Sequence, residues 1–338
     1  MTMIKVGIVG CGKQASRHIT SLKRIPNIMP VLADIDAGIA QKMADQEECG
    51  FVEHPDALIG AGDISALVIC TPTQTHVPLI KNSFAEGIHV FCEKPLSDDL
   101  QEIQDLKPIV DSSDLILQIG YIYRYVPAFE EGARLLRHQT INGESMVLGR
   151  PLTGYFRLGG RGSHQPWKHK VATGGGAINE MLVHMIDLAT WYFGPLNHVE
   201  SISNRLHLPE RVIGGETHQV DAEDFILVRC SGKSGVEVYC QADLVTPAFT
   251  QYVEIQCQNG TFRGSIQPDS PSFIFVNNAA GGYNSGKTVL QYGQRNLLDI
   301  QMTSFVHSVL KNKKPDRNTI EDSLALTKII DKIRKGTQ

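Results

Sequence analysis

Three polar residues in one apolar segment have the types and spacing that suit proton transfer. Glu180, His184 and Asp187 are spaced i, i+4 and i+7, so on an α-helix they would lie within about sixty degrees on one face. A carboxylate one turn before an imidazole orients the ring and raises its basicity, which is typical of a general acid/base. Structural hydrogen bonds between domains and metal binding stay open as alternatives. No third ligand lies at a helpful spacing, so no metal is expected.

A glycine-rich turn near the N-terminus has the pattern of a dinucleotide site. The segment Gly10-Cys11-Gly12-Lys13-Gln14-Ala15 follows an apolar strand and precedes a helical pattern, as the G-x-G-x-x-A motif requires. Gly10 would allow the tight turn, and Gly12 would let the backbone approach a pyrophosphate at the helix N-terminus. Ala15 would let helix and strand pack closely. An ordinary tight turn between strand and helix is the alternative.

Acidic residues after the second predicted strand bear on which dinucleotide would bind. Asp34 stands 24 residues after Gly10, where a carboxylate can accept hydrogen bonds from the adenosine ribose hydroxyls. Its charge would repel a 2′-phosphate, and Ile35 supplies no cation to receive one. These residues favour NAD over NADP. Asp36 competes for the ribose role, with a solvated turn position as its other interpretation.

Two further predicted strands end in polar residues, and ligands of open α/β sheets bind beyond the carboxyl ends of the strands. The hydroxyls of Thr71 and Thr73 would line the cofactor, or Thr75 would merely cap the next helix. The Glu93-Lys94 pair is costly after a buried strand unless it has a use, and a plain ion pair is the alternative. The predicted cofactor-binding residues are Gly10, Gly12, Lys13, Gln14, Ala15, Asp34, Thr71, Thr73, His76, Glu93 and Lys94.

The elements that must position these residues are of two kinds. Over residues 1–123, short apolar runs alternate with helical patterns, which predicts βαβ units and a doubly wound parallel sheet of the Rossmann type. The expected strands are 4–9, 29–34, 51–53, 66–70, 89–92 and 116–120, and helices are expected over 14–24, 76–86 and 98–111.

From residue 124 the pattern changes to longer strands with period-two alternation, as in 225–230, 235–243 and 252–258. This predicts an α+β domain over 124–338, built on a mostly antiparallel open sheet. Asn259-Gly260 predicts a hairpin, since this pair supplies the two positive φ angles of a type I′ turn. Closing helices are expected over 296–311 and 319–334, the second capped by Thr319 or Asn318 and free to pack back on the first domain.

Composition argues against several classes of function. The 338 residues carry a formal net charge of -4, which argues against a nucleic-acid partner. The N-terminal apolar run is too short for a signal peptide, and no later run approaches membrane-spanning length, so a soluble cytoplasmic protein with no membrane partner is expected. The 7 cysteines form no C-x-x-C pair, as expected of buried thiols in a reducing compartment.

Taken together, these motifs resemble the glucose-fructose oxidoreductase and inositol dehydrogenase family, often written Gfo/Idh/MocA. The resemblance spans essentially the whole chain. It rests on Val6 to Gly12 with His18, Thr71-Pro72-Thr73 with His76, Glu93-Lys94-Pro95, Gly120-Tyr121-Ile122-Tyr123-Arg124 with Pro127, and Gly174-Gly175-Gly176 leading to His184 and Asp187. It implies a Rossmann domain with an open antiparallel sheet, NAD or NADP, homodimers or homotetramers, and hydride transfer at a carbinol of sugars, cyclitols or their derivatives.

The resemblance also implies roles for single residues. It makes Lys94 the catalytic lysine that touches the reacting hydroxyl and His184 the acid/base histidine. The position four before that histidine is commonly Asp in the family, and Glu180 keeps the charge with one more methylene. Whether Glu180 or His184 accepts the proton therefore stays open. Thr73 stands where Asn is frequent.

These features predict an NAD-dependent oxidoreductase with catalytic residues Lys94, His184 and Glu180, acting on a polyol or sugar-like substrate between its domains. Candidate substrate contacts are Arg124, Trp167, Lys168, His169 and Lys170, with a solvated basic loop as the alternative. Three other functions stay open: a nucleotide-sugar or sugar-phosphate dehydrogenase whose phosphate meets the lysine cluster, an NAD-using glycosidase, and a non-catalytic NAD-sensing regulator. The presence of both Lys94 and His184 argues against the regulator.

Overall fold

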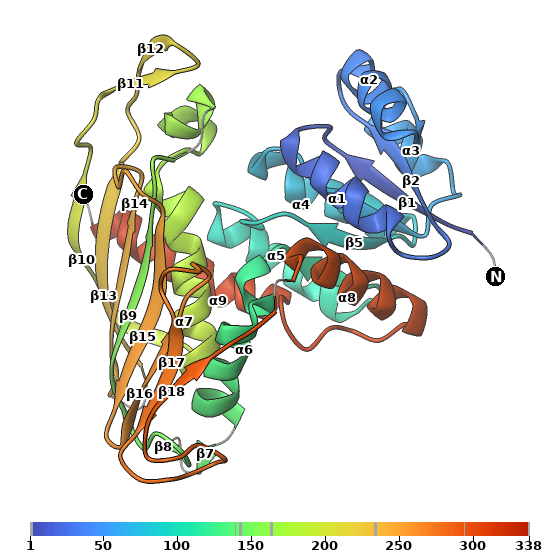
Figure 1. Cartoon of the computed structure of the whole chain (residues 1–338). Helices are drawn as coiled ribbons and strands as arrows, with labels where there is room; N and C mark the ends of the chain where they lie inside the picture. Colours follow the sequence, from blue (N-terminus) through green and yellow to red (C-terminus); the bar gives the residue numbers. More distant parts are fainter. Residues whose placement is uncertain are drawn as a thin grey trace. The chain divides into compact units, whose positions relative to one another are not determined.

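Six parallel strands form the sheet of an N-terminal unit (Figure 1). The computed structural model describes residues 3–138, 140–141, 144–162, 165–232, 235–293 and 295–336. The strands run in the order β3-β2-β1-β4-β5-β6. Their bounds are β1 (Ile4–Val9), β2 (Ile28–Ala33), β3 (Gly50–Phe51), β4 (Ala66–Ile69), β5 (His89–Cys92) and β6 (Leu117–Ile119). The central strand β4 is buried along its whole length, because helices cover both faces of such sheets. The predicted doubly wound sheet is confirmed.

Helices from both ends of the chain belong to this unit. They are α1 (Lys13–Lys23), α2 (Ala37–Glu47), α3 (Pro55–Gly60), α4 (His76–Ala85), α5 (Leu100–Asp111) and α8 (Leu297–Lys311). Helix α8 packs on α1, and its Met302 and Phe305 join the core of β1 and β5 around Ile8 and Phe91. Within the described ranges, no helix is long and apolar enough to cross a membrane.

The chain divides into two compact units, which we call the first and the second unit. The first comprises Met1–Tyr125 with Gln294–Leu324, and the second comprises Val126–Gly293 with Ala325–Gln338. The sequence-based division placed a single boundary after residue 123. The chain instead returns to the first unit after the second sheet is complete, and helix α9 (Ile320–Gly336) contributes residues to both units.

An eight-stranded sheet forms the second unit, in the order β10-β13-β14-β9-β15-β16-β17-β18. Only the β14–β9 pairing is parallel among the described strand pairs of this sheet, so the predicted, mostly antiparallel sheet is confirmed. Its strands are β9 (Pro151–Gly159), β10 (Leu196–Arg205), β13 (Phe225–Gly232), β14 (Glu237–Asp243), β15 (Thr250–Cys257), β16 (Gly260–Gly264), β17 (Ser272–Val276) and β18 (Gly286–Leu290). Burial alternates along β15, as expected of a sheet with one face on a core.

Smaller elements complete the second unit. Helix α7 (Val183–Phe193) packs against β9 and β14, and α6 (Pro127–Ala133) packs against β16. Two short hairpins pair β7 (Thr140–Ile141) with β8 (Glu144–Ser145), and β11 (Glu210–Ile213) with β12 (Glu216–Gln219). Figure 1 shows the β11–β12 hairpin beyond one end of the eight-stranded sheet.

The β15–β16 hairpin forms as predicted, but its turn uses different residues. Cys257 pairs with Gly260, so the two loop residues are Gln258 and Asn259, and neither Asn259 nor Gly260 has a positive φ angle. The predicted type I′ turn at Asn259-Gly260 is therefore wrong. A Cβ on Gly260 would lie 2.2 Å from the carbonyl oxygen of Phe275 on β17, so this glycine permits a close strand approach.

Candidate active site

The glycine turn after β1 combines a strained position with an open one. Gly10 has a φ of +90°, and a Cβ there would lie 2.8 Å from the backbone of Cys70 and Thr71. A Cβ on Gly12 would meet no atom within 4 Å. Gly12 is the N-cap residue of α1, and no side chain caps that helix. Open space beside an uncapped helix N-terminus is the arrangement that binds phosphate groups.

This contrast gives a matched pair of variants. Gly10→Ala is expected to destabilise the protein by about 2 kcal/mol or more, because it forces an alanine into a left-handed conformation against backbone atoms. Gly12→Ala should keep the stability of the wild type and weaken NAD binding by about tenfold or more, since its methyl group occupies the space that a pyrophosphate needs. Urea unfolding and calorimetric titration with NAD measure the two effects. Equal losses of stability in both variants would contradict the assignment of a conformational role to Gly10 and a pyrophosphate-binding role to Gly12.

The two aspartates after β2 have different roles. The Asp34 carboxylate accepts hydrogen bonds from the backbone N–H of Cys11, at 2.7 Å, and of Asp36, at 3.0 Å. Asp34 is thereby fixed beside the glycine turn. Asp36 is the N-cap of α2 and accepts from the N–H groups of Gly38 and Ile39. Capping accounts for Asp36, so Asp34 is the carboxylate that geometry favours for the ribose.

Glu93, at the end of β5, is held from two sides. Its Oε1 accepts from Gln14 Nε2 at 3.1 Å and lies 2.7 Å from Nε2 of the buried His18, and its Oε2 lies 3.3 Å from the N–H of Lys94. Burial would raise the pKa of Glu93, but the hydrogen bond and charge of His18, together with Lys94 and Gln14, lower it. This carboxylate anchors the Lys94 segment to α1, so for Glu93 and Gln14 the geometry favours positioning over direct cofactor contact.

His76 joins the two loops that follow β4 and β5. Its Nδ1 lies 2.9 Å from the carbonyl oxygen of Pro95 and its Nε2 lies 3.0 Å from that of Thr71. Burial lowers its pKa, although these carbonyls oppose the shift. Thr75 makes no side-chain cap of α4. Its hydroxyl instead lies 2.7 Å from the hydroxyl of Thr71. The backbone of Cys70 and Thr71 borders the glycine turn, since a Cβ on Gly10 would lie 2.8 Å from it.

The segment that carries Glu180 and His184 is not one regular α-helix. Residues Ile178–Leu182 form a π-helical turn, and α7 begins only at Val183. The prediction of one regular helix is therefore wrong for residues 178–182, which form a wider turn. Single π turns of this kind occur frequently at functional sites. Glu180 and His184 are partly exposed, whereas Asp187 is buried.

The residues of the predicted substrate loop point in different directions. Lys168 forms an ion pair with Glu180, its Nζ 2.8 Å from Oε2, and lies over the ring of Trp167, 5.2 Å from its centroid. Trp167 is 44% exposed, while His169 is 2% exposed. The basic sequence 168–170 is therefore not a cluster of three solvent-facing cations. The Lys168–Glu180 pair was not predicted from the sequence.

Arg124 is a buried residue of the segment after β6. It is 1% exposed, and its NH1 lies 3.0 Å from Oδ2 of Asp322. Asp322 also accepts from the N–H of Thr319 at 2.9 Å, while the Thr319 hydroxyl lies 3.4 Å from the N–H of Asp322. This reciprocal cap confirms Thr319 at the start of α9. The geometry favours a structural role for Arg124, which ties α9 to the segment after β6, over the predicted substrate contact.

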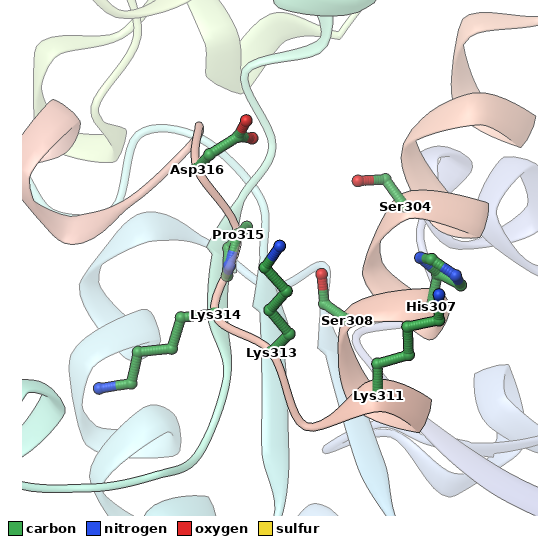
Figure 2. Close-up of a pocket in the computed structure, with 8 residues that line it drawn as sticks. All are labelled: Ser304, His307, Ser308, Lys311, Lys313, Lys314, Pro315 and Asp316. Atoms are coloured by element: carbon green, nitrogen blue, oxygen red, sulfur yellow. The ribbon is translucent and has the colours of Figure 1, made fainter.

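A concave site at the C-terminal end of α8 contains none of the predicted site residues (Figure 2). It is lined by Ser304, His307, Ser308, Lys311, Lys313, Lys314, Pro315 and Asp316. Lys311 lies in the last turn of α8, where a cation stabilises the negative end of the helix dipole. Lys314 Nζ donates to the carbonyl oxygen of Val110 near the end of α5. These contacts give Lys311 and Lys314 structural roles.

The first unit has the strand order and the glycine turn of a dinucleotide-binding protein, and its second β-strand ends in a fixed carboxylate. Among the described residues, no group of three or more His, Cys, Asp or Glu side chains could hold a metal ion. The chain belongs to the Gfo/Idh/MocA oxidoreductase family: residues 4–121 match its NAD-binding Rossmann-fold model, and residues 144–263 match its C-terminal domain model. The predicted family is confirmed, and the protein is an NAD-binding oxidoreductase.

The chain is similar to several known proteins. It is 30% identical over 194 residues to an uncharacterized oxidoreductase, YrbE, of Bacillus subtilis (strain 168), which covers 56% of this chain and 54% of that protein. It is 26% identical over 265 residues to inositol 2-dehydrogenase of Rhizobium meliloti (strain 1021), covering 78% of this chain and 76% of that enzyme. The structure of levoglucosan dehydrogenase with NADH and levoglucosan shares the fold, with a TM-score of 0.86 at 17% identity over 99% of this chain and 97% of that one.

Proposed function

We propose that this protein catalyses NAD-dependent hydride transfer at a carbinol of a neutral sugar, cyclitol or derivative. The observation that carries the proposal is the partly exposed pair Glu180 and His184 on an otherwise largely buried helical segment. A carboxylate and an imidazole are the groups expected to move a hydroxyl proton near neutral pH. The similarity to inositol 2-dehydrogenase and to levoglucosan dehydrogenase supports a polyol substrate.

The first unit would hold NAD through its backbone and one carboxylate. The open space at Gly12 and the uncapped start of α1 fit the pyrophosphate. Asp34, fixed by the N–H of Cys11, fits the ribose hydroxyls. When bound, NAD supplies the hydride acceptor.

The protein's own side chains then handle the proton and the developing charge. In this proposal a ring nitrogen of His184 accepts the proton of the substrate hydroxyl, and the Glu180 carboxylate orients and stabilises the imidazolium. Lys94 Nζ donates a hydrogen bond to the same oxygen while negative charge develops on it. Glu93 supports that step by holding the backbone N–H of Lys94.

A neutral substrate suits the loop around Trp167 better than a phosphorylated one. Lys168 already has a carboxylate partner in Glu180, and the side chain of His169 is buried, so this loop offers a weaker anion site than the sequence suggested. The exposed ring of Trp167 can stack on the apolar C–H face of a sugar or cyclitol. Lys168 and His169 therefore give less support to the sugar-phosphate and nucleotide-sugar alternatives than their sequence suggested.

Asp34 should decide the choice of cofactor. The wild type is expected to prefer NAD over NADP by about a hundredfold, since a close like-charge contact is worth on the order of a few kcal/mol at an effective dielectric near 20. Asp34→Ser should narrow or reverse the preference, and it should also weaken NAD itself because the N–H of Cys11 loses its acceptor. Titrations at low salt measure both affinities. Equal affinity of the wild type for NAD and NADP would show that Asp34 does not face the ribose.

The proposed function is tested by incubating the protein with NAD and a panel of inositols, levoglucosan, simple sugars, sugar phosphates and nucleotide sugars, while recording the absorbance of reduced nicotinamide. Turnover of a neutral polyol is expected. A clear preference for the sugar phosphates or nucleotide sugars would show that the substrate is phosphorylated and not a neutral polyol. Cofactor that stays bound and returns to its oxidised form would indicate a glycosidase, and NAD binding with no turnover of any member would indicate a regulator.

We also propose a cytoplasmic homodimer or homotetramer. All 7 cysteines are free, as expected of a reducing compartment. One face of the eight-stranded sheet exposes the large apolar side chains of Tyr155, Phe275 and Val289, and the ring of Tyr155 stacks on that of Tyr239. Exposed apolar patches are typical of surfaces that bind another protein chain. Light scattering of the purified protein measures the assembly, and a monomer at all concentrations would contradict the proposal.

A further inference from the structure

Lys168 and Glu180 form an ion pair on the segment that precedes α7. The Nζ–Oε2 distance is 2.8 Å, and the two side chains are 24% and 18% exposed. Lys168 lies on the 3-10 turn Pro166–His169, and Glu180 lies on the π turn Ile178–Leu182. Such a short, partly shielded pair is stronger than a solvated surface pair.

Gly176 connects the backbones of both partners. Its N–H donates to the carbonyl oxygen of Lys168 at 3.0 Å, and its own carbonyl oxygen accepts from the N–H of Glu180 at 3.0 Å. The neighbouring Gly175 makes this contact sterically possible, because a Cβ there would lie 2.4 Å from the carbonyl oxygen of Lys168. The glycine run therefore brings the lysine turn and the glutamate turn together backbone to backbone.

Glu223 fixes the start of the π turn. Its Oε1 accepts from the N–H of Ile178 at 2.9 Å, and its carbonyl oxygen accepts from the N–H of Ala177 at 2.8 Å. Burial raises the pKa of Glu223. A Cβ on Gly176 would lie 2.3 Å from Oε1 of Glu223 and would displace this carboxyl group, and the φ of +108° at this position also favours glycine.

Several other charged groups lie on the elements that pack against this turn. Strands β9 and β14 pack against it and carry Arg157 and Asp243, which pair with each other at 2.6 Å. Arg334 of α9 donates to Oδ1 of Asn179. His184 follows Glu180 on the same segment. Lys168 is a cation in direct contact with Glu180, so their ion pair can influence the state of that carboxylate.

We propose that Lys168 is a positioning residue for proton transfer: it keeps Glu180 ionised, fixes the direction of its carboxylate, and offsets part of its charge toward His184. The proposal rests on the proposed function of Glu180 and His184 in moving the hydroxyl proton. An adjacent cation favours the charged form of a carboxylate. Without Lys168, Glu180 would hold a proton more readily, and its remaining charge would stabilise the imidazolium of His184 more strongly.

Both effects shift the acidic limb of the pH profile in the same direction. Lys168→Met is expected to lower kcat about tenfold, change KM by less than about threefold, and move the acidic limb of kcat/KM to higher pH by about one unit, a tenfold change in proton affinity. Lys168→Arg should restore most of the activity and of the profile, because an arginine also pairs with the carboxylate. Lys335→Met removes an exposed lysine paired with Asp331 at 2.8 Å and should leave kcat, KM and the acidic limb unchanged.

A second readout does not depend on turnover. In the ligand-free full-length protein, the carbon-13 signal of the Glu180 carboxyl group, assigned by its loss in Glu180→Gln, should titrate at higher pH in Lys168→Met than in the wild type. An unchanged titration would overturn the proposal. So would a raised KM with unchanged kcat and pH profile, which would make Lys168 a simple substrate contact. If no substrate is turned over, the carboxyl titration still tests the ion pair, and the failure then belongs to the proposed function.

Discussion

Lys94→Met is expected to lower kcat by about a hundredfold to a thousandfold, the loss typical of removing a fixed donor that stabilises developing negative charge. The affinity for NAD should change by less than about tenfold, because the Gly12 turn and Asp34 supply most of the proposed cofactor contacts. Steady-state kinetics with the best polyol of the panel, and calorimetric titration with NAD, measure the two quantities.

The structure indicates that the variant should fold. Glu93 holds the segment through the backbone N–H of residue 94 and through the side chains of His18 and Gln14, and methionine leaves all three contacts in place. Lys81→Met is the matched control, since it removes an exposed lysine of α4 in the same unit. Full activity of Lys94→Met would show that Lys94 acts only through its position in the fold.

The parallel sheet could be predicted from the sequence because burial on both faces produces uniformly apolar strands. The expected strand 4–9 coincides with β1, and 89–92 coincides with β5. The glycine turn could be predicted because its backbone needs are local: Gly10 must adopt a positive φ. Asp36 could have been recognised as a helix cap, since it directly precedes α2.

Features set by tertiary contacts could not be predicted in this way. The apolar face of residues 297–311 indicates a helix but not the sheet on which it packs, and α8 joins the first unit. The π turn before α7 depends on hydrogen bonds to Glu223 and Gly176, which no helical periodicity encodes. The role of Gly260 could not be predicted either, because the residue that approaches it closely, Phe275, lies on another strand, β17.

The candidate site also has features that the local sequence encodes and features that only tertiary contacts set. Residue types and motif positions indicated Lys94, Glu180 and His184, whereas the partners of these residues come from the fold. Lys168 pairs with Glu180, and the glycine run connects their backbones. His18 of α1 pairs with Glu93 at the carboxyl end of β5. The sequence contained both partners, but without coordinates a lysine in a basic loop is more simply read as a solvated or substrate-binding group.

His184→Ala is expected to lower kcat by about a hundredfold or more, in the range found when a general base is removed. Glu180→Gln should cost less, because the amide keeps the shape of the side chain but loses the charge that stabilises the imidazolium. The acidic limb of kcat/KM should therefore move to lower pH in Glu180→Gln. His307→Ala, which removes an exposed histidine of α8, is the control for both.

The direction of this shift separates the two possible proton acceptors. If His184 is the base, Glu180→Gln and Lys168→Met move the acidic limb in opposite directions, because one removes the carboxylate and the other removes the cation that offsets it. If the Glu180 carboxylate is itself the acceptor, Glu180→Gln becomes the more damaging variant and His184→Ala keeps the acidic limb of the wild type. Measuring kcat/KM against pH for all three variants therefore assigns the proton to one side chain.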